Sequence, residues 1–171
     1  MVCRVLLLPI LLLGISMCTP ASPPPTPIGT VSSGGITFSW AHIGGELRCH
    51  VQAPTTGWVA IGFNEVAELT GTRLVMGAFV NGEAIVSDRT VVAPGDHRPI
   101  EDVGGVSDLS QPSGTERDGT TEISFTLPAA TAHEWSHDLR QGTTVHLLLA
   151  YSVADEFDHH SRVRRHLTVR L

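Results

Sequence analysis

The sequence of 171 residues has no lysine, and its 11 basic residues are all arginine. Acidic residues number 17, which gives a formal net charge of -6. A chain of that sign is repelled by phosphate backbones, and no block of basic residues overrides the repulsion. We therefore expect no nucleic-acid partner.

Cysteine is almost as scarce, with three residues in the whole sequence. This is too few for a disulfide-stapled scaffold, and a hydrophobic content of 42% is too high for a disordered chain. Cys49 shares one face of an alternating run with Leu47 and Val51, so we expect a small buried side chain without a disulfide. The length fits one domain with a core.

The common enzyme motifs are also missing. The sequence contains no GxSxG elbow, P-loop, Rossmann glycine pattern or HExxH pair. Cys49 is a poor nucleophile candidate because a buried thiol is usually inert. We expect a protein that is not an enzyme.

No apolar run is long enough to span a bilayer core, which needs roughly 20 residues. The run at 5–15 follows a single positive charge at Arg4 and has the length of a secretory h-region. We predict a signal peptide at 1–17, a Pro-rich tether at 18–34 and a folded domain at 35–171. The tether is extended and semi-rigid, so it suits a domain held away from a surface.

Cys18 ends the apolar segment and is followed by a stretch rich in Pro, Ser and Thr. This arrangement resembles a bacterial lipoprotein signal, in which cleavage before Cys18 leaves that cysteine for lipidation and attachment to a membrane. Met17 stands where such signals usually have Gly or Ala. The alternative is ordinary cleavage near Ala21 and a secreted product. In both cases the domain is exported and extracytoplasmic, and the first makes it a cell-envelope lipoprotein.

From residue 28 onward, apolar and polar residues alternate with a period of two, which is typical of strands. Asn81-Gly82 is a strong hairpin signal, and residues 129–139 could hold a short helix after Pro128. Eight to ten short strands with Gly and Pro punctuation predict a single all-β domain, an antiparallel β-sandwich. The clearest strands lie at 36–40, 47–51, 57–63, 74–80, 83–87, 123–127, 145–151 and 163–171.

Titratable side chains gather at 155–164, where His159 and His160 are adjacent. Neighbouring residues in a strand point to opposite faces, but a junction between loop and strand relaxes this restriction. The cluster is either a solvated turn or the source of an imidazole ligand for a metal or haem iron. Asp96-His97 leaves the same two alternatives open with less support.

Met76 is the only methionine that remains after the predicted signal peptide is removed. In an apolar strand, a lone methionine usually fills a gap in the core. Beside a cavity that faces a histidine, its thioether sulfur is instead a candidate ligand for haem iron.

The order of these pieces resembles the DOMON domain. The resemblance rests on GWVAIGFN at 57–64, LTGTRLVMG at 69–77 leading into a hairpin, SDR at 87–89, the strand at 123–127, and FDHH at 157–160 followed by Arg164. It covers approximately residues 35–171.

The resemblance implies an extracytoplasmic, immunoglobulin-like β-sandwich that binds b-type haem or sugars. Haem-binding members have a His and a Met as axial ligands, and His160 falls at the position of the His. Leu69 is the best match to the Met, and leucine cannot ligate iron. The resemblance therefore leaves His160 with an open site, or with His159 or Met76 as its partner.

For a haem pocket, the resemblance implies an apolar cleft and a guanidinium near the propionates. Trp58, Leu69 and Leu74 are candidates for the cleft. Arg164 and Arg73 are candidates for the guanidinium.

Two kinds of function follow. The first is an exported, membrane-tethered cytochrome that passes single electrons to a redox partner protein. The alternative is a haem-free module that binds a carbohydrate or another small ligand, with Trp135 as the stacking platform, or a partner protein through the basic strand residues Arg162, Arg164 and Arg170.

Overall fold

The computed structural model describes residues 29–130 and 133–171. The predicted signal peptide and the lipidation site at Cys18 lie outside the described residues. Within these ranges, the structure contains no helix that is long and apolar enough to cross a membrane.

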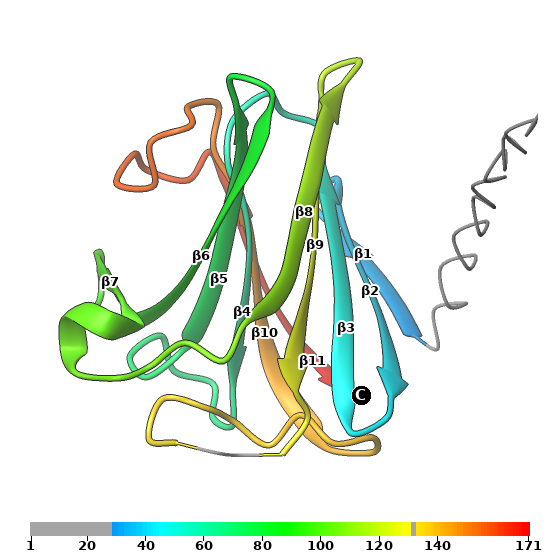
Figure 1. The fold of residues 1–171 in the computed structure, drawn as a ribbon, viewed down its shortest axis with the longest axis vertical. Coiled ribbons are helices and arrows are strands. Elements are labelled where there is room, and N and C mark those ends of the chain that lie inside the picture. Colours follow the sequence, from blue (N-terminus) through cyan, green and yellow to red (C-terminus); the bar gives the residue numbers. More distant parts are fainter. Residues whose placement is uncertain (1–28, 131–132) are drawn as a thin grey trace, which may run out of the picture.

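Two antiparallel sheets pack face to face, as predicted for a β-sandwich (Figure 1). The five-stranded sheet has the order β1-β2-β3-β9-β8, and the six-stranded sheet has the order β11-β10-β4-β5-β6-β7. The strands of the first are β1 (Gly29–Ser33), β2 (Ile36–Ile43), β3 (Glu46–Ala53), β8 (Ser110–Arg117) and β9 (Thr120–Pro128). Those of the second are β4 (Val59–Asn64), β5 (Arg73–Val80), β6 (Glu83–Ala93), β7 (Asp96–Pro99), β10 (Thr144–Tyr151) and β11 (Val163–Arg170), with the 3-10 turn η1 (Ile100–Val103) after β7.

The main core lies between the sheets and follows from alternation along the strands. Leu47, Cys49 and Val51 all face it and are at most 3% exposed, so the prediction for Cys49 is confirmed. In β4 the side chains of Val59 and Ile61 also enter this core. All six residues of β4 are buried, because both faces of this strand are covered. This is why residues 57–63 read as a continuous apolar run.

The hairpin signal at Asn81-Gly82 is also confirmed. Both residues have positive φ, 53° and 88°, as the tight turn between β5 and β6 requires. The turn fixes the register of β5 against β6, which decides which side chains reach the outer face of the sheet.

The described residues form eleven strands, more than the eight to ten expected. β1 begins at Gly29, within the range predicted for the tether. β7 and β8 lie between residues 87 and 123, where the sequence indicates no clear strand. Both β1 and β8 are edge strands of their sheet with largely polar sequences, so they lack the apolar alternation that identifies a strand.

The short helix expected within 129–139 is wrong for the residues described there, which form turns and bends. Ala129 N–H donates to the Gly45 carbonyl at 2.9 Å, and Leu139 N–H donates to the Ala129 carbonyl at 2.9 Å. The chain thereby folds back and inserts the fully buried Leu139 into the core. Burial of Leu139 therefore decides the path of this segment.

Candidate functional site on the outer face of the six-stranded sheet

A second apolar cluster lies on the outer face of the six-stranded sheet. Because side chains alternate along a strand, the neighbours of the core residues on β4, β5 and β10 point to this face. They form an apolar floor from Ala60, Leu74, Met76, Leu148 and Ala150, all at most 7% exposed. Leu69, Val80 and Phe157 pack against this floor, so it forms a second apolar layer outside the main core.

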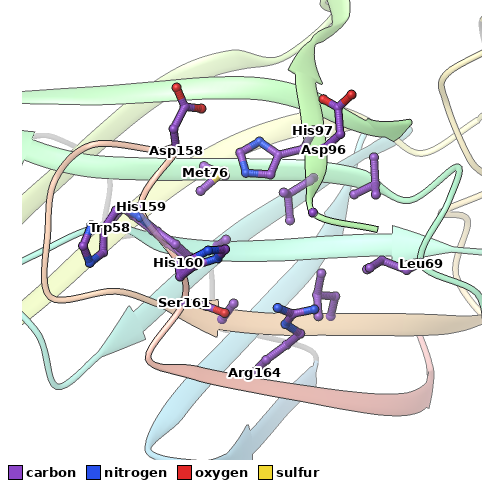
Figure 2. Close-up of a pocket in the computed structure, with 16 residues that line it drawn as sticks. Trp58, Leu69, Met76, Asp96, His97, Asp158, His159, His160, Ser161 and Arg164 are labelled. Carbon is purple, nitrogen blue, oxygen red and sulfur yellow. The ribbon is translucent and has the colours of Figure 1, made fainter. Parts of the chain in front are cut away.

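Above this floor runs an open groove (Figure 2). Leu69 reaches it from the loop between β4 and β5, and His97 reaches it from β7. Residues 158–161 contribute from the loop before β11, and Arg164 from β11 itself. The groove is open to solvent, and the space within it together with its mouth amounts to about 630 Å³.

The glycine that opens the GWVAIGFN segment supports the loop before β11. A Cβ on Gly57 would lie 2.5 Å from the backbone nitrogen of Ala154, so only glycine allows this close approach. The adjacent Trp58 N–H donates to the Ala154 carbonyl at 3.0 Å, and Ser152 N–H donates to the Trp58 carbonyl at 2.9 Å. Gly57 therefore lets the 153–162 loop lie directly against β4.

Ser152 fixes the part of that loop that carries the histidines. Its hydroxyl is fully buried and donates to the backbone carbonyl of His160 at 3.1 Å. The backbone N–H of Arg162 donates to the Tyr151 carbonyl at 2.8 Å. The backbone of His160 is thus held at the groove, and Figure 2 shows its imidazole pointing into it.

The imidazoles of His159 and His160 are exposed and have no hydrogen-bond or ion-pair partner among the residues that the structure describes. An imidazole without an internal partner keeps a nitrogen lone pair for a ligand or a metal. Because these residues precede β11, strand alternation does not apply, and both line the groove.

The residue that ends GWVAIGFN supports the opposite wall. The Asn64 side-chain amide donates to the backbone carbonyls of Glu68 at 2.9 Å and Thr70 at 3.3 Å, and its oxygen accepts from Val66 N–H at 3.2 Å. These bonds shape the loop that carries Leu69. The two ends of the motif therefore hold the two loops that flank the groove.

His97 differs from the other two histidines because a buried arginine holds it. Arg89 Nε donates to His97 Nδ1 at 2.9 Å, and Arg89 Nη2 donates to the His97 carbonyl at 3.1 Å. Burial lowers the pKa of His97, the charge of Arg89 lowers it further, and the carboxylates of Asp158 and Asp96 act in the opposite direction. His97 is therefore maintained in its neutral form.

Most of the candidates from the sequence come together in this groove. They are Trp58, Leu69, Leu74, Met76, His159, His160 and Arg164. Arg73 does not line it. It shares the inner face of β5 with Val75, where Arg73 Nε donates to Asp88 Oδ1 at 3.0 Å and Nη2 donates to Asp88 Oδ2 at 2.6 Å. Arg73 also bonds Asp108, so its guanidinium is held on the inner face and away from the groove.

Three further side chains belong to the site or its support. His97 has weak support from the sequence, and Arg89 and Asp158 lie within the SDR and FDHH segments of the resemblance without an assigned role. For Arg89, the sequence offers one signal, which is an arginine directly before the Thr-Val-Val segment of a strand. Trp135, the candidate platform for a sugar, is absent from the groove: its ring lies beside Gly105.

Comparison with known proteins identifies the family. The model of the DOMON domain matches residues 32–152, well over half of the sequence. The chain belongs to the DOMON family. The match ends before His159 and His160, so it does not extend to the histidine side of the groove.

Solved structures agree on the fold of this DOMON domain. The cytochrome domain of cellobiose dehydrogenase from Myriococcum thermophilum is 12% identical, with a TM-score of 0.59 over 84% of this chain and 81% of that one. The cytochrome b domain of pyranose dehydrogenase from Coprinopsis cinerea is also 12% identical, with a TM-score of 0.57 over 79% and 76%. A search of curated proteins gives no match.

The residues of the groove are compatible with b-type haem. The floor is apolar and the His160 imidazole has no internal partner. Arg164 supplies a guanidinium at the rim for a carboxylate. The side chain of Leu69 offers no ligand atom, and Met76 Sγ and the imidazole of His159 are the sequence's candidates for a second axial position.

Proposed function

We propose that this DOMON domain is an exported, membrane-tethered module that binds b-type haem through His160 and passes single electrons to a redox partner protein. The observation that carries the proposal is the unpartnered imidazole of His160, held by its backbone at the edge of an apolar groove. When bound, haem supplies reversible one-electron chemistry at its iron.

The chain's own residues have separable roles in this proposal. Ser152 orients His160, because its hydroxyl bonds the His160 carbonyl. The apolar floor excludes water, which favours an apolar macrocycle by the hydrophobic effect. No nucleophile or general base is needed, since no bond of a substrate is made or broken. The module is therefore an electron carrier and not an enzyme.

With His160 as the first ligand, we infer an open second axial position first, and His159 or Met76 as a weak partner second. Met76 is 1% exposed on the floor, so its sulfur is in the groove but at its base. In the alternative function the groove takes a carbohydrate or another small ligand without haem.

An absorption spectrum of the purified chain with added haem, before and after reduction, tests the proposal. We expect a protein-bound Soret band that is lost in His160→Ala and kept in the matched control His166→Ala. His166 is also exposed on the six-stranded sheet but does not line this groove. A wild-type spectrum identical to that of free haem would refute haem binding and favour the alternative.

The same spectra identify the second ligand. A five-coordinate spectrum supports an open site. A six-coordinate, low-spin spectrum that becomes five-coordinate in Met76→Leu assigns Met76, and the same change in His159→Ala assigns His159.

Attachment to a membrane is tested separately. We expect the exported wild-type chain to fractionate with membranes and Cys18→Ala to be released as a soluble product. Release of the wild-type chain would instead support the secreted form.

A further inference from the structure

The contact between Arg89 and His97 fixes which nitrogen of His97 carries the proton. A guanidinium only donates hydrogen bonds, so Nδ1 of His97 must accept from Arg89 Nε at 2.9 Å. In a neutral imidazole the other nitrogen then bears the proton. Nε2 of His97 is consequently an N–H donor.

This arrangement makes His97 unsuited to iron. A nitrogen that carries a proton has no lone pair for a metal, and exchange of the two nitrogens would direct an N–H of His97 against the guanidinium of Arg89. The imidazole of His160 has no such restraint among the residues described. The two histidines therefore differ in chemistry although both line the groove.

The position of Arg89 favours an anionic partner for this donor. Arg89 is 9% exposed, and its guanidinium lies 5.8 Å from the ring centre of Phe157. The carboxylate of Asp158 is 3.8 Å away and almost fully exposed. Burial lowers the pKa of Arg89, and the opposing charges of Asp158 and Asp102 do not outweigh it. The other rim carboxylate, Asp96, is already bonded to Arg98 at 2.8 and 3.2 Å. A buried charge that is incompletely compensated polarises the imidazole between it and the groove, which strengthens Nε2–H as a donor.

We propose that His97 is a hydrogen-bond donor for a carboxylate of the ligand in this groove, and that Arg89 is the residue that positions it. The identity of the ligand rests on the proposed function: if the ligand is haem, the carboxylate is a propionate. A charge-assisted bond of this kind contributes about 1.5–3 kcal/mol, roughly a tenfold to hundredfold change in affinity.

Iron-free protoporphyrin IX tests this proposal without involving the axial ligands. We expect His97→Leu to weaken protoporphyrin IX binding about tenfold or more in a fluorescence titration, and His97→Gln, whose amide still donates, to recover part of the loss. For protoporphyrin IX dimethyl ester, which has no carboxylate, the effect of His97→Leu should be less than about twofold. The matched control His166→Leu should change neither affinity.

The outcomes separate the two proposals. Equal effects of His97→Leu on the acid and the ester, or no binding of protoporphyrin IX by the wild type, would overturn the role of His97. Wild-type binding of protoporphyrin IX together with a free-haem spectrum would refute only iron ligation by His160. A change of haem coordination bands in His97→Leu would show that His97 is an axial ligand and would also overturn its role as a donor.

The role of Arg89 is tested by nitrogen-15 NMR of the His97 imidazole. We expect the Nε2–H tautomer in the wild type, loss of that preference in Arg89→Met, and its recovery in Arg89→Lys, which restores a donor. The Nδ1–H tautomer in the wild type would refute the positioning role, because a purely structural arginine does not dictate the tautomer.

Discussion

The two faces of the six-stranded sheet each bury an arginine, and the two arginines are compensated differently. On the inner face, Arg73 is 1% exposed and bonds two carboxylates, those of Asp88 and Asp108. On the outer face, Arg89 is 9% exposed and bonds a neutral imidazole and a backbone carbonyl instead. Its nearest carboxylate is 3.8 Å away in solvent.

The difference separates a structural charge from one that serves the groove. The guanidinium of Arg73 is compensated by two carboxylates, and it ties β5, β6 and the 104–109 segment together. The guanidinium of Arg89 is not neutralised by a close carboxylate. An anionic ligand in the groove would offset the free-energy cost of burying the charge of Arg89.

The largest expected effect comes from removing the charge on the inner face. Arg73→Met leaves the carboxylates of Asp88 and Asp108 without a counter-charge inside the protein, so it should destabilise the fold by about 3–5 kcal/mol. Urea unfolding of the variant measures the loss. The control Arg140→Ala breaks an ion pair with Asp138 at the surface and should cost less than about 1 kcal/mol.

Arg89→Met should cost clearly less stability than Arg73→Met, since no buried carboxylate loses its partner. Equal losses for the two variants would show that both arginines are structural, and the distinction between the faces would fail.

Alanine substitutions at two glycines test the packing on the two faces of the sheet separately. A Cβ on Gly57 would collide with the backbone of Ala154, which supports the His160 loop, whereas a Cβ on Gly77 would collide with Ile123 in the core at 2.6 Å. Each substitution by alanine should cost about 1–3 kcal/mol in urea unfolding. Only Gly57→Ala should also weaken porphyrin binding, because it displaces the loop at the groove. A loss of binding in Gly77→Ala would contradict the separation of the two faces.

Much of the sandwich could be predicted because its central strands carry the pattern locally. β4 and β10 are buried on both faces and read as continuous apolar runs, and β3 alternates cleanly. β7 and β8 could not be predicted in this way. They gain their strand structure from hydrogen bonds to the neighbouring strands β6 and β9, and their own residues carry little apolar alternation.

Some of the candidate site could also be predicted from local alternation, and some of it could not. Alternation places Leu74 and Met76 on one face of β5, and the same alternation places Arg73 with Val75 on the other, so its exclusion from the groove was open to prediction. The pairing of Arg89 with His97 was not, because it depends on the β-bulge in β6 after Val91 and on the turn into β7.

The lowered pKa of His97, on the outer face of the sheet, predicts that the stability of the protein depends on pH. Burial, and then the charge of Arg89, keep its folded-state pKa below the unfolded value of about 6.5. The unfolded state therefore binds more protons as the pH falls, so the stability that is present above pH 6.5 is lost as the pH falls through the folded-state pKa.

Urea unfolding at a series of pH values between 7.5 and 5 measures this. The free energy of unfolding of the wild type should decrease more steeply than that of His97→Gln, which cannot titrate. Because His97 is partly exposed, the difference between the two slopes should be small. A steeper decrease in His97→Gln would contradict the direction of the shift.

The smallest expected effect concerns Cys49, which lies on β3 and faces the sealed side of the sandwich. Burial raises the pKa of its thiol strongly, and the opposing effect of the Arg73 charge is smaller. The thiolate is the reactive form, so Cys49 should show no measurable reaction with an aromatic disulfide reagent in the native protein and full reaction after unfolding in urea. The Cys18→Ala variant leaves Cys49 as the only thiol of the exported chain. Rapid labelling of native Cys49 would mean that the core opens readily, and the contrast between a closed inner face and an open outer groove would then not hold.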